Sequence, residues 1–280
     1  MKWKIVTDSG SCIRSLDPYT TTIDFQVVPM IIRVDDQQII DDESLDTQLM
    51  LEKMQKSKNT STACPSPSTY AEAFKGAEQV ICFTLSSGVS GSYNAANSGK
   101  DLQLEQAPQT QIHIVDSKSA GAEMDLLILQ TIHLIDQGLS FEQVIEKLSQ
   151  LQSQNSVNYL LESVENLVKN GRIPKLVGQM IGLLSVRLIG KRSKQGTLKL
   201  AQKARGNQRA IKVLVKEMIK EGYQGGQVII NHVHNPKLCQ ELKDLILDQF
   251  PNAQVLSNLA SGLCSYYAQD QGLIVGYHCQ

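Results

Sequence analysis

The fold of this 280-residue chain is best decided from the stretch Val80-Ile-Cys-Phe-Thr84-Leu-Ser86-Ser87-Gly88-Val-Ser90-Gly91-Ser92-Tyr93-Asn94-Ala-Ala96. Its first residues, Val80 to Phe83, are apolar and rich in β-branched and aromatic side chains, which predicts a buried strand. A turn dense in hydroxyls and glycine follows, and a helix begins near Tyr93. Ligands of open α/β sheets bind beyond the carboxyl ends of strands, so this turn is a candidate anion site. A tight turn in which each serine bonds its own backbone explains the same residues equally well.

Strands and helices alternate on both sides of this stretch. Lys4–Thr7 and Thr110–Val115 are predicted strands, and a long helix is predicted from about Gly121 to Gln137. This alternation favours a parallel sheet with helices on both faces. Polar turns follow three of the strands, at Asp8, Ser86 and Asp116, and we expect them to line one edge of one cleft.

A polar segment near residue 155 divides the chain. We therefore expect an α/β protein of two α/β domains, residues 1–155 with the parallel sheet and residues 156–280 with a second α/β unit. In the second half, Ser185–Ile189 and Thr197–Ala201 flank a turn and predict a hairpin. The apolar segment Lys175–Leu184 is predicted to be helical.

Two segments of the first half are harder to assign. Gln26–Val34 is interpreted as one strand region, in which Pro29 favours a strand start or an edge position. Thr60–Pro67 is expected only to break one helix and lead into the next.

Composition excludes several classes of protein. Lys and Arg number 27 against 28 Asp and Glu, so no global charge calls for nucleic acid or an anionic membrane. The apolar runs are too short to span a bilayer, and the start of the sequence lacks the apolar region of a signal peptide. Six scattered cysteines form no CxxC pair, which is typical of a reduced, cytoplasmic protein.

The chemical motifs do not indicate a nucleotide site, but they leave a serine nucleophile possible. No GxGxxG or Walker loop is present, so a dinucleotide or P-loop site is not expected. The segment around Ser90 resembles a nucleophile elbow, but Ser92 stands where that motif has glycine. A serine hydrolase acting on lipid esters through Ser90 is therefore the alternative function. It needs one of five histidines as its base: His113, His133, His232, His234 and His278.

Two histidines and a run of basic residues each allow a functional and a structural interpretation. His232 and His234 alternate on one strand, as metal ligands do, but packing is favoured because no partner ligand pattern lies nearby. The densest run of positive charge is either a solvated hairpin face or a docking surface for an acidic partner or a phosphate-bearing ligand. Its members are Lys191, Arg192, Lys194, Lys199, Lys203, Arg205 and Arg209.

Arg172, after the turn Asn170-Gly171, is the best single candidate to bind a carboxylate, and a helix-capping or surface role is equally open.

An ordered set of short motifs runs along the chain. The set consists of Ile5-Val-Thr-Asp8-Ser9, Val27-Val-Pro-Met-Ile31 with Asp41, Thr62-Ala-Cys-Pro65-Ser66-Pro67, Ser86-Ser87-Gly-Val-Ser90-Gly91-Ser92-Tyr93, Val115-Asp116-Ser117, Asn170-Gly171-Arg172-Ile173 and Lys203-Ala-Arg205-Gly206. In this order and spacing the motifs resemble the DegV family, which includes the fatty-acid-binding subunits of bacterial fatty acid kinase. The resemblance covers nearly the whole chain and is most specific up to Gly206.

This resemblance implies a long-chain fatty acid buried between two α/β domains. It assigns the carboxylate to Thr62 and Ser90, with Ser87 and Gly91 as neighbours and Arg172 as the family's arginine. It further implies a protein that is no catalyst by itself, needs no cofactor or metal, and presents the carboxylate to an ATP-dependent kinase. That kinase makes an acyl phosphate for phospholipid synthesis. Peripheral membrane contact stays open.

The chain departs from the family pattern in two places. Thr62-Ala63-Cys64-Pro65-Ser66 replaces T-S-Q-P-S, and Tyr267–Gln271 replaces the usual H-x-G-P-G turn, so the family's histidine has no obvious successor. A divergent lipid sensor without kinase coupling, or an interaction module with a vestigial cleft, are the remaining alternatives. Apolar residues of Met124–Leu134 and Leu176–Ile189 are candidates for the tunnel wall, and equally for ordinary core.

Overall fold

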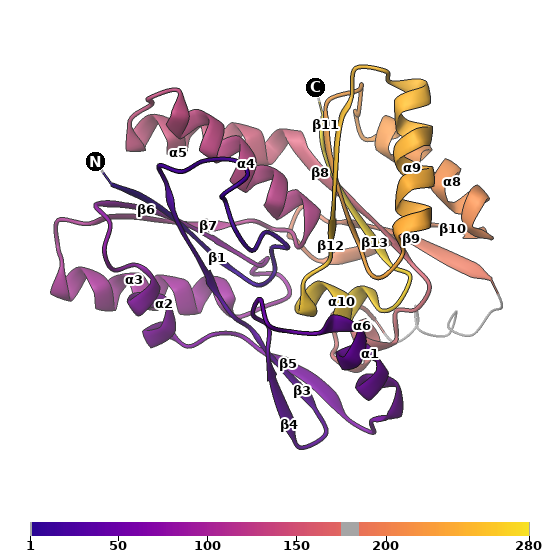
Figure 1. Ribbon diagram of the computed structural model, residues 1–280, viewed down its shortest axis with the longest axis horizontal. Coiled ribbons are helices and arrows are strands. Elements are labelled where there is room, and N and C mark those ends of the chain that lie inside the picture. Colours follow the sequence, from indigo (N-terminus) through magenta and orange to yellow (C-terminus); the bar gives the residue numbers. More distant parts are fainter. Residues whose placement is uncertain (1, 175–184, 280) are drawn as a thin grey trace.

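A parallel sheet with the order β2-β1-β6-β7 forms the centre of the first half of the protein. The computed structural model in Figure 1 describes residues 2–174 and 185–279. β6 is the predicted central strand, and all six of its side chains are buried. The helices that follow β6 and β7 are also where the sequence predicts them. The elements of this part are β1 (Trp3–Asp8), β2 (Asp24–Val28), α2 (Pro67–Ala73), β6 (Gln79–Thr84), α3 (Ser92–Gln106), β7 (Gln111–Asp116), α4 (Ala122–Asp136) and α5 (Phe141–Gln154).

A small antiparallel sheet, β4-β3-β5, corrects two predictions made from the sequence. Gln26–Val34 is not one strand region, because the chain leaves the parallel sheet at Pro29 and re-pairs in the small sheet. Thr60–Pro67 is not merely a helix breaker, because its β-branched threonines form a strand. The elements are β3 (Ile31–Val34), β4 (Gln37–Ile40), α1 (Thr47–Lys56) and β5 (Thr60–Ala63).

The second half contains a mixed six-stranded sheet with the order β10-β9-β8-β13-β11-β12. Successive side chains of its inner strands point to opposite faces of the sheet, and both faces are apolar. Leu160 and Val275 pack with α8 in one core cluster, whereas Tyr159 and Ile274 pack with the start of α4 in another. α4 of the first half thus packs on the second sheet (Figure 1). The elements are β8 (Asn155–Leu161), α6 (Glu165–Lys169), β9 (Val186–Arg192), β10 (Leu198–Arg205), α8 (Asn207–Lys220), β11 (Gln227–His232), α9 (Pro236–Gln249), β12 (Gln254–Leu259), α10 (Gly262–Ala268) and β13 (Leu273–His278).

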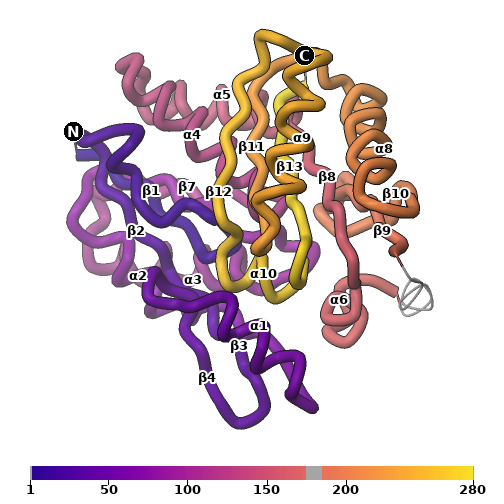
Figure 2. The backbone as a smooth tube through the Cα atoms, turned by 45° about the vertical axis from the view of Figure 1, so that its right-hand side comes forward, coloured from indigo at the N-terminus to yellow at the C-terminus, as the bar shows by residue number. Residues whose placement is uncertain are grey.

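The expected α/β architecture is confirmed: a parallel sheet in the first part and a second α/β sheet after it. The hairpin is β9 and β10, while the helix predicted over 175–184 lies outside the described residues. The predicted boundary falls at the start of β8, and the division into domains 1–155 and 156–280 stays a prediction. α1 and the small sheet lie against α10, which joins them to the second half (Figure 2).

Within residues 2–174 and 185–279, no helix has both the length and the apolar character needed to cross a bilayer.

Candidate ligand-binding site

The polar turns after β1, β6 and β7 meet at the carboxyl edge of the parallel sheet, as expected from the sequence. The buried Asp8 carboxylate accepts hydrogen bonds from the backbone N–H of Leu85 at 2.8 Å and of Gly10 at 2.9 Å. Burial raises the pKa of the Asp8 carboxyl. Asp116 accepts from the N–H of Ser87 at 2.9 Å and from its hydroxyl at 2.5 Å. These groups brace the turns against one another instead of lining a cleft.

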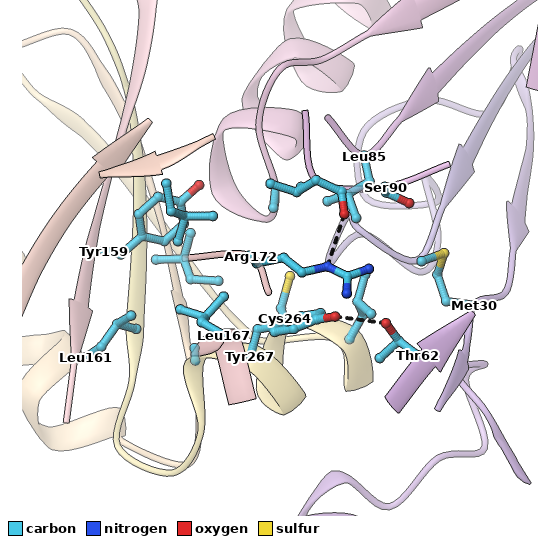
Figure 3. A pocket seen from close by; sticks show the side chains of 16 residues that line it. Met30, Thr62, Leu85, Ser90, Tyr159, Leu161, Leu167, Arg172, Cys264 and Tyr267 are labelled. Atoms are coloured by element: carbon cyan, nitrogen blue, oxygen red, sulfur yellow. Dashed lines mark hydrogen bonds between the residues drawn. The ribbon is translucent and has the colours of Figure 1, made fainter. Parts of the chain in front are cut away.

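A largely apolar cavity lies just beyond this edge, and its empty space, including the part open to solvent, is about 620 Å³ (Figure 3). The turn after β6 contributes Leu85, Val89 and Ser90, and β5 contributes Thr62. The second half supplies the facing wall from α6, α10 and the six-stranded sheet. Its lining side chains include Tyr159, Leu161, Leu167, Leu198, Leu263, Cys264, Tyr267 and Ile274.

The structure brings together three of the five residues that the sequence singled out. Thr62, Ser90 and Arg172 line the cavity. Ser87 is exposed and bonded to Asp116, and Gly91 precedes α3, so neither belongs to the described lining. In Figure 3, Thr62 and Met30 lie at the end opposite Tyr159 and Leu161.

Ser90 is held by bonds within its own turn, and Arg172 is held by the carbonyls of Val89 and Asn170. The Ser90 hydroxyl donates to the Ser92 hydroxyl at 3.2 Å, and the Ser92 N–H donates back to Ser90 Oγ at 3.2 Å. Arg172 Nε donates to the carbonyl of Val89 at 3.2 Å, and its Nη1 donates to the carbonyl of Asn170 at 2.5 Å. Among the described residues, no carboxylate forms an ion pair with Arg172, so its positive charge is available to an anion.

Tyr267 is the site residue that sequence reasoning missed. Its hydroxyl lies 2.8 Å from Thr62 Oγ1, and the Arg172 guanidinium lies over its ring, 6.0 Å from the centroid. The residue belongs to α10, a helix not anticipated from the sequence, although Ser261 caps it by accepting from the N–H of Cys264. The comparison of Tyr267–Gln271 with the H-x-G-P-G turn shows only which residues this segment lacks. The phenol itself was the overlooked signal.

The alternative chemistries find less support in this geometry. No histidine is among the described residues that line the cavity, so Ser90 has no imidazole base beside it. In the described part of the chain, no group of three or more His, Cys, Asp or Glu side chains is placed to hold a metal ion. His234 bonds Thr47 at 2.9 Å instead.

The basic run is divided between internal pairing and the surface. Arg192 pairs with the fully buried Glu123 at 2.9 Å, and Lys191 pairs with Glu221 at 2.6 Å. Burial raises the pKa of Glu123, and the adjacent Arg192 opposes that shift. The exposed members of the run are Lys194, Lys199, Lys203, Arg205 and Arg209.

None of the described residues of Met124–Leu134 or Leu176–Ile189, which were candidates for the tunnel wall or for ordinary core, lines this cavity. Met124, Leu127 and Ile128 of α4 are buried in the core against the parallel sheet and are not among the described lining residues. The wall is built instead from α6, α10 and strands β8, β10 and β13. Most of Leu176–Ile189 lies outside the described residues.

A family model and a known bacterial protein both match nearly the whole chain. A family model described as "Uncharacterised protein, DegV family" matches residues 2–272. A DegV domain-containing protein of Streptococcus pyogenes serotype M3 is 46% identical over 278 residues, 99% of each chain.

Solved structures agree over the same length. The Streptococcus pneumoniae fatty acid kinase (Fak) B3 protein, loaded with linoleic acid, matches with a TM-score of 0.97 and 43% identity over 100% of both chains. A DegV family protein of Eubacterium eligens, loaded with heptadecanoic acid, matches with a TM-score of 0.96 and 32% identity over 99% of this chain and 100% of that one. Sequence motifs, fold and full-length similarity all lead to one conclusion: this chain belongs to the DegV family.

Proposed function

We propose that this protein binds one long-chain fatty acid in the cavity of Figure 3, with the carboxylate at Thr62 and Ser90. The observation that carries the proposal is the distribution of polarity in the lining. The hydroxyls of Thr62, Ser90 and Tyr267 lie with Arg172 toward one end, whereas the opposite end has Leu161 and, as its one hydroxyl-bearing residue among those described, Tyr159 (Figure 3). Leucines and Ile274 make up most of the remaining lining. An amphiphile with one anionic end and a long apolar tail matches that distribution.

The energetics of such binding follow from the same residues. Burial of each CH₂ of the tail is worth roughly 0.8 kcal/mol. Neutral hydroxyl donors and the partly exposed Arg172 hold a carboxylate without burying an unpaired charge. The bound linoleic and heptadecanoic acids of the two relatives support a long acyl chain as the ligand.

We further propose that the protein is the non-catalytic, cytoplasmic binding subunit of a fatty acid kinase system. The similarity to the fatty acid kinase (Fak) B3 protein supports a kinase partner that phosphorylates the carboxylate with ATP. The exposed cations Lys199, Lys203 and Arg205 on edge strand β10 offer that partner a basic docking surface.

The test uses purified, delipidated protein and linoleic acid, with native mass spectrometry to count bound molecules. We expect one linoleate per chain. Thr62→Ala combined with Ser90→Ala should weaken binding at least tenfold, whereas the control Ser87→Ala should not, because Ser87 faces Asp116 outside the cavity. Unchanged affinity in the double variant contradicts the placement of the carboxylate. Labelling of Ser90 by a fluorophosphonate would support the hydrolase alternative.

A further inference from the structure

Two tyrosines that follow one another in α10 meet two threonines of β5. Thr60 and Thr62 are two residues apart on one strand, so their side chains point to the same face. The Tyr266 hydroxyl donates to Thr60 Oγ1 at 2.8 Å, and the Tyr267 and Thr62 hydroxyls lie 2.8 Å apart. The two rings pack edge to face with centroids 4.7 Å apart. Both pairs join the small sheet to the second half of the protein.

The two pairs differ in how completely their hydrogen-bonding capacity is used. The Tyr266 hydroxyl donates to Thr60 and also accepts from Asn170 Nδ2 at 2.8 Å, so it is used in both directions. The Tyr267 and Thr62 hydroxyls bond only each other among the described residues. Two hydroxyls that share one hydrogen bond use one proton and leave the second O–H without an acceptor.

The two pairs also differ in what surrounds them. Thr62 and Tyr267 line the cavity, whereas Thr60 and Tyr266 do not appear among its described lining residues. The Arg172 guanidinium lies 6.0 Å from the centre of the Tyr267 ring, within cation–π range. The unused O–H therefore borders the cavity beside a positive charge, which is an environment for a group that only accepts hydrogen bonds (Figure 3).

We propose that Tyr267 is a specificity-determining residue: with Thr62 it donates one hydrogen bond to each oxygen of the ligand's carboxylate. The paired hydroxyls turn from each other to the two carboxylate oxygens, and Arg172 remains stacked on the ring. This inference rests on the proposed function. It adds that the site selects the ionised acid over an ester of the same chain, because an ester lacks the charge and the second equivalent acceptor oxygen.

The test compares Tyr267→Phe with the matched control Tyr266→Phe, which removes the same atom from the neighbouring residue. Affinities for linoleate and for methyl linoleate are measured on delipidated protein, and thermal unfolding verifies that each variant is folded. We expect Tyr267→Phe to weaken linoleate binding about tenfold, which corresponds to about 1.4 kcal/mol, and methyl linoleate binding less than twofold. Tyr266→Phe should leave the ratio of the two affinities unchanged. Thr62→Val, which removes the other hydroxyl, should lower that ratio as Tyr267→Phe does.

The outcomes separate this inference from the function on which it rests. If the unmodified protein does not bind linoleate, the proposed function is wrong. If it binds linoleate and Tyr267→Phe keeps the same preference for acid over ester, only the role of Tyr267 is overturned. An equal loss of affinity for acid and ester in Tyr267→Phe also overturns it, because that result marks a residue that merely shapes the cavity.

Discussion

At the scale of single residues, the candidate site relies on groups that do not titrate near neutral pH. Burial raises the pKa of Tyr267 above its usual value near 10, and the nearby Thr62 hydroxyl and Arg172 oppose that shift. The phenol therefore keeps its proton throughout the neutral range. The hydroxyls of Thr62 and Ser90 do not titrate in that range either.

The affinity for linoleate is accordingly expected to stay constant between about pH 7 and pH 9. It should fall only at higher pH, where Tyr267 loses its proton and changes from a donor to an anion that repels the carboxylate. Fluorescence or calorimetric titration of linoleate from about pH 6 to about pH 11 is the measurement, with Tyr267→Phe as the control that should show no alkaline loss. An inflection near pH 6.5 would point to a histidine instead.

At the scale of elements, helix α10 is positioned by a carboxylate from the small sheet. Asp41 directly follows β4 and is fully buried. It accepts from the backbone N–H groups of Gly262 and Leu263 at 2.9 and 2.7 Å, and from Arg14 Nη2 at 2.7 Å. These bonds satisfy the otherwise free donors at the start of the helix that carries Tyr267.

Asp41→Ala should lower the free energy of unfolding by about 3 kcal/mol, because it removes those bonds and leaves Arg14 without its partner. The matched control is Asp42→Ala, since Asp42 is exposed and its carboxylate bonds only Ser44 among the described residues. Its effect should stay within about 0.5 kcal/mol. Urea unfolding gives both values, and similar losses in the two variants would contradict the role assigned to Asp41.

The β9–β10 hairpin forms a second link between the two halves of the protein. Its turn approaches the turn after β6 so closely that the Ser86 hydroxyl donates to the carbonyl of Gly196 at 2.8 Å. A Cβ on Gly196 would lie 2.0 Å from Ser86 Oγ and 2.9 Å from the Cα of Lys118. The contact lies two residues from Leu198, which lines the cavity.

Gly196→Ala should destabilise the protein by about 2 kcal/mol more than Gly76→Ala. Both glycines have positive φ, +76° and +84°, so both substitutions strain the backbone, but a Cβ on Gly76 meets nothing within 4 Å. The difference between the two variants in urea unfolding isolates the close approach from the strain. Equal losses of unfolding free energy in the two variants would mean that the hairpin turn shifts to accommodate the added Cβ without destabilising the protein.

At the scale of the whole molecule, the ligand is expected to act as part of the core. The cavity is lined from the parallel half, the small sheet and the six-stranded sheet, so an acyl chain in it contacts all three. A ligand that binds only the folded state stabilises it by mass action.

Linoleate at about one hundred times its dissociation constant should add about 2.7 kcal/mol to the free energy of unfolding. For a chain of this size that raises the melting temperature by about 5 °C. Differential scanning calorimetry of delipidated protein with and without linoleate measures the shift. The variant with both Thr62→Ala and Ser90→Ala should shift much less at the same linoleate concentration, and an equal shift would indicate lipid binding elsewhere.

The sequence by itself determined those features that short segments encode. The apolar run of β6, its hydroxyl-rich turn and the alternation of strands and helices all depend on neighbouring residues. The family motifs also sufficed to select Thr62, Ser90 and Arg172, which the fold brings to one cavity. Hydrophobic periodicity and the residues at the ends of helices and strands act over short distances in the chain, so local sequence patterns predict them.

Only the tertiary structure decided the features that depend on distant partners. Thr62 and Tyr267 are 205 residues apart, and no residue near Tyr267 in the sequence predicts their hydrogen bond. The split of Gln26–Val34 at Pro29 follows from which strands were available to pair with each part. Likewise, Arg192 became an internal partner of Glu123 instead of a surface cation. Each outcome was set by the burial and pairing of groups that meet only in the folded chain.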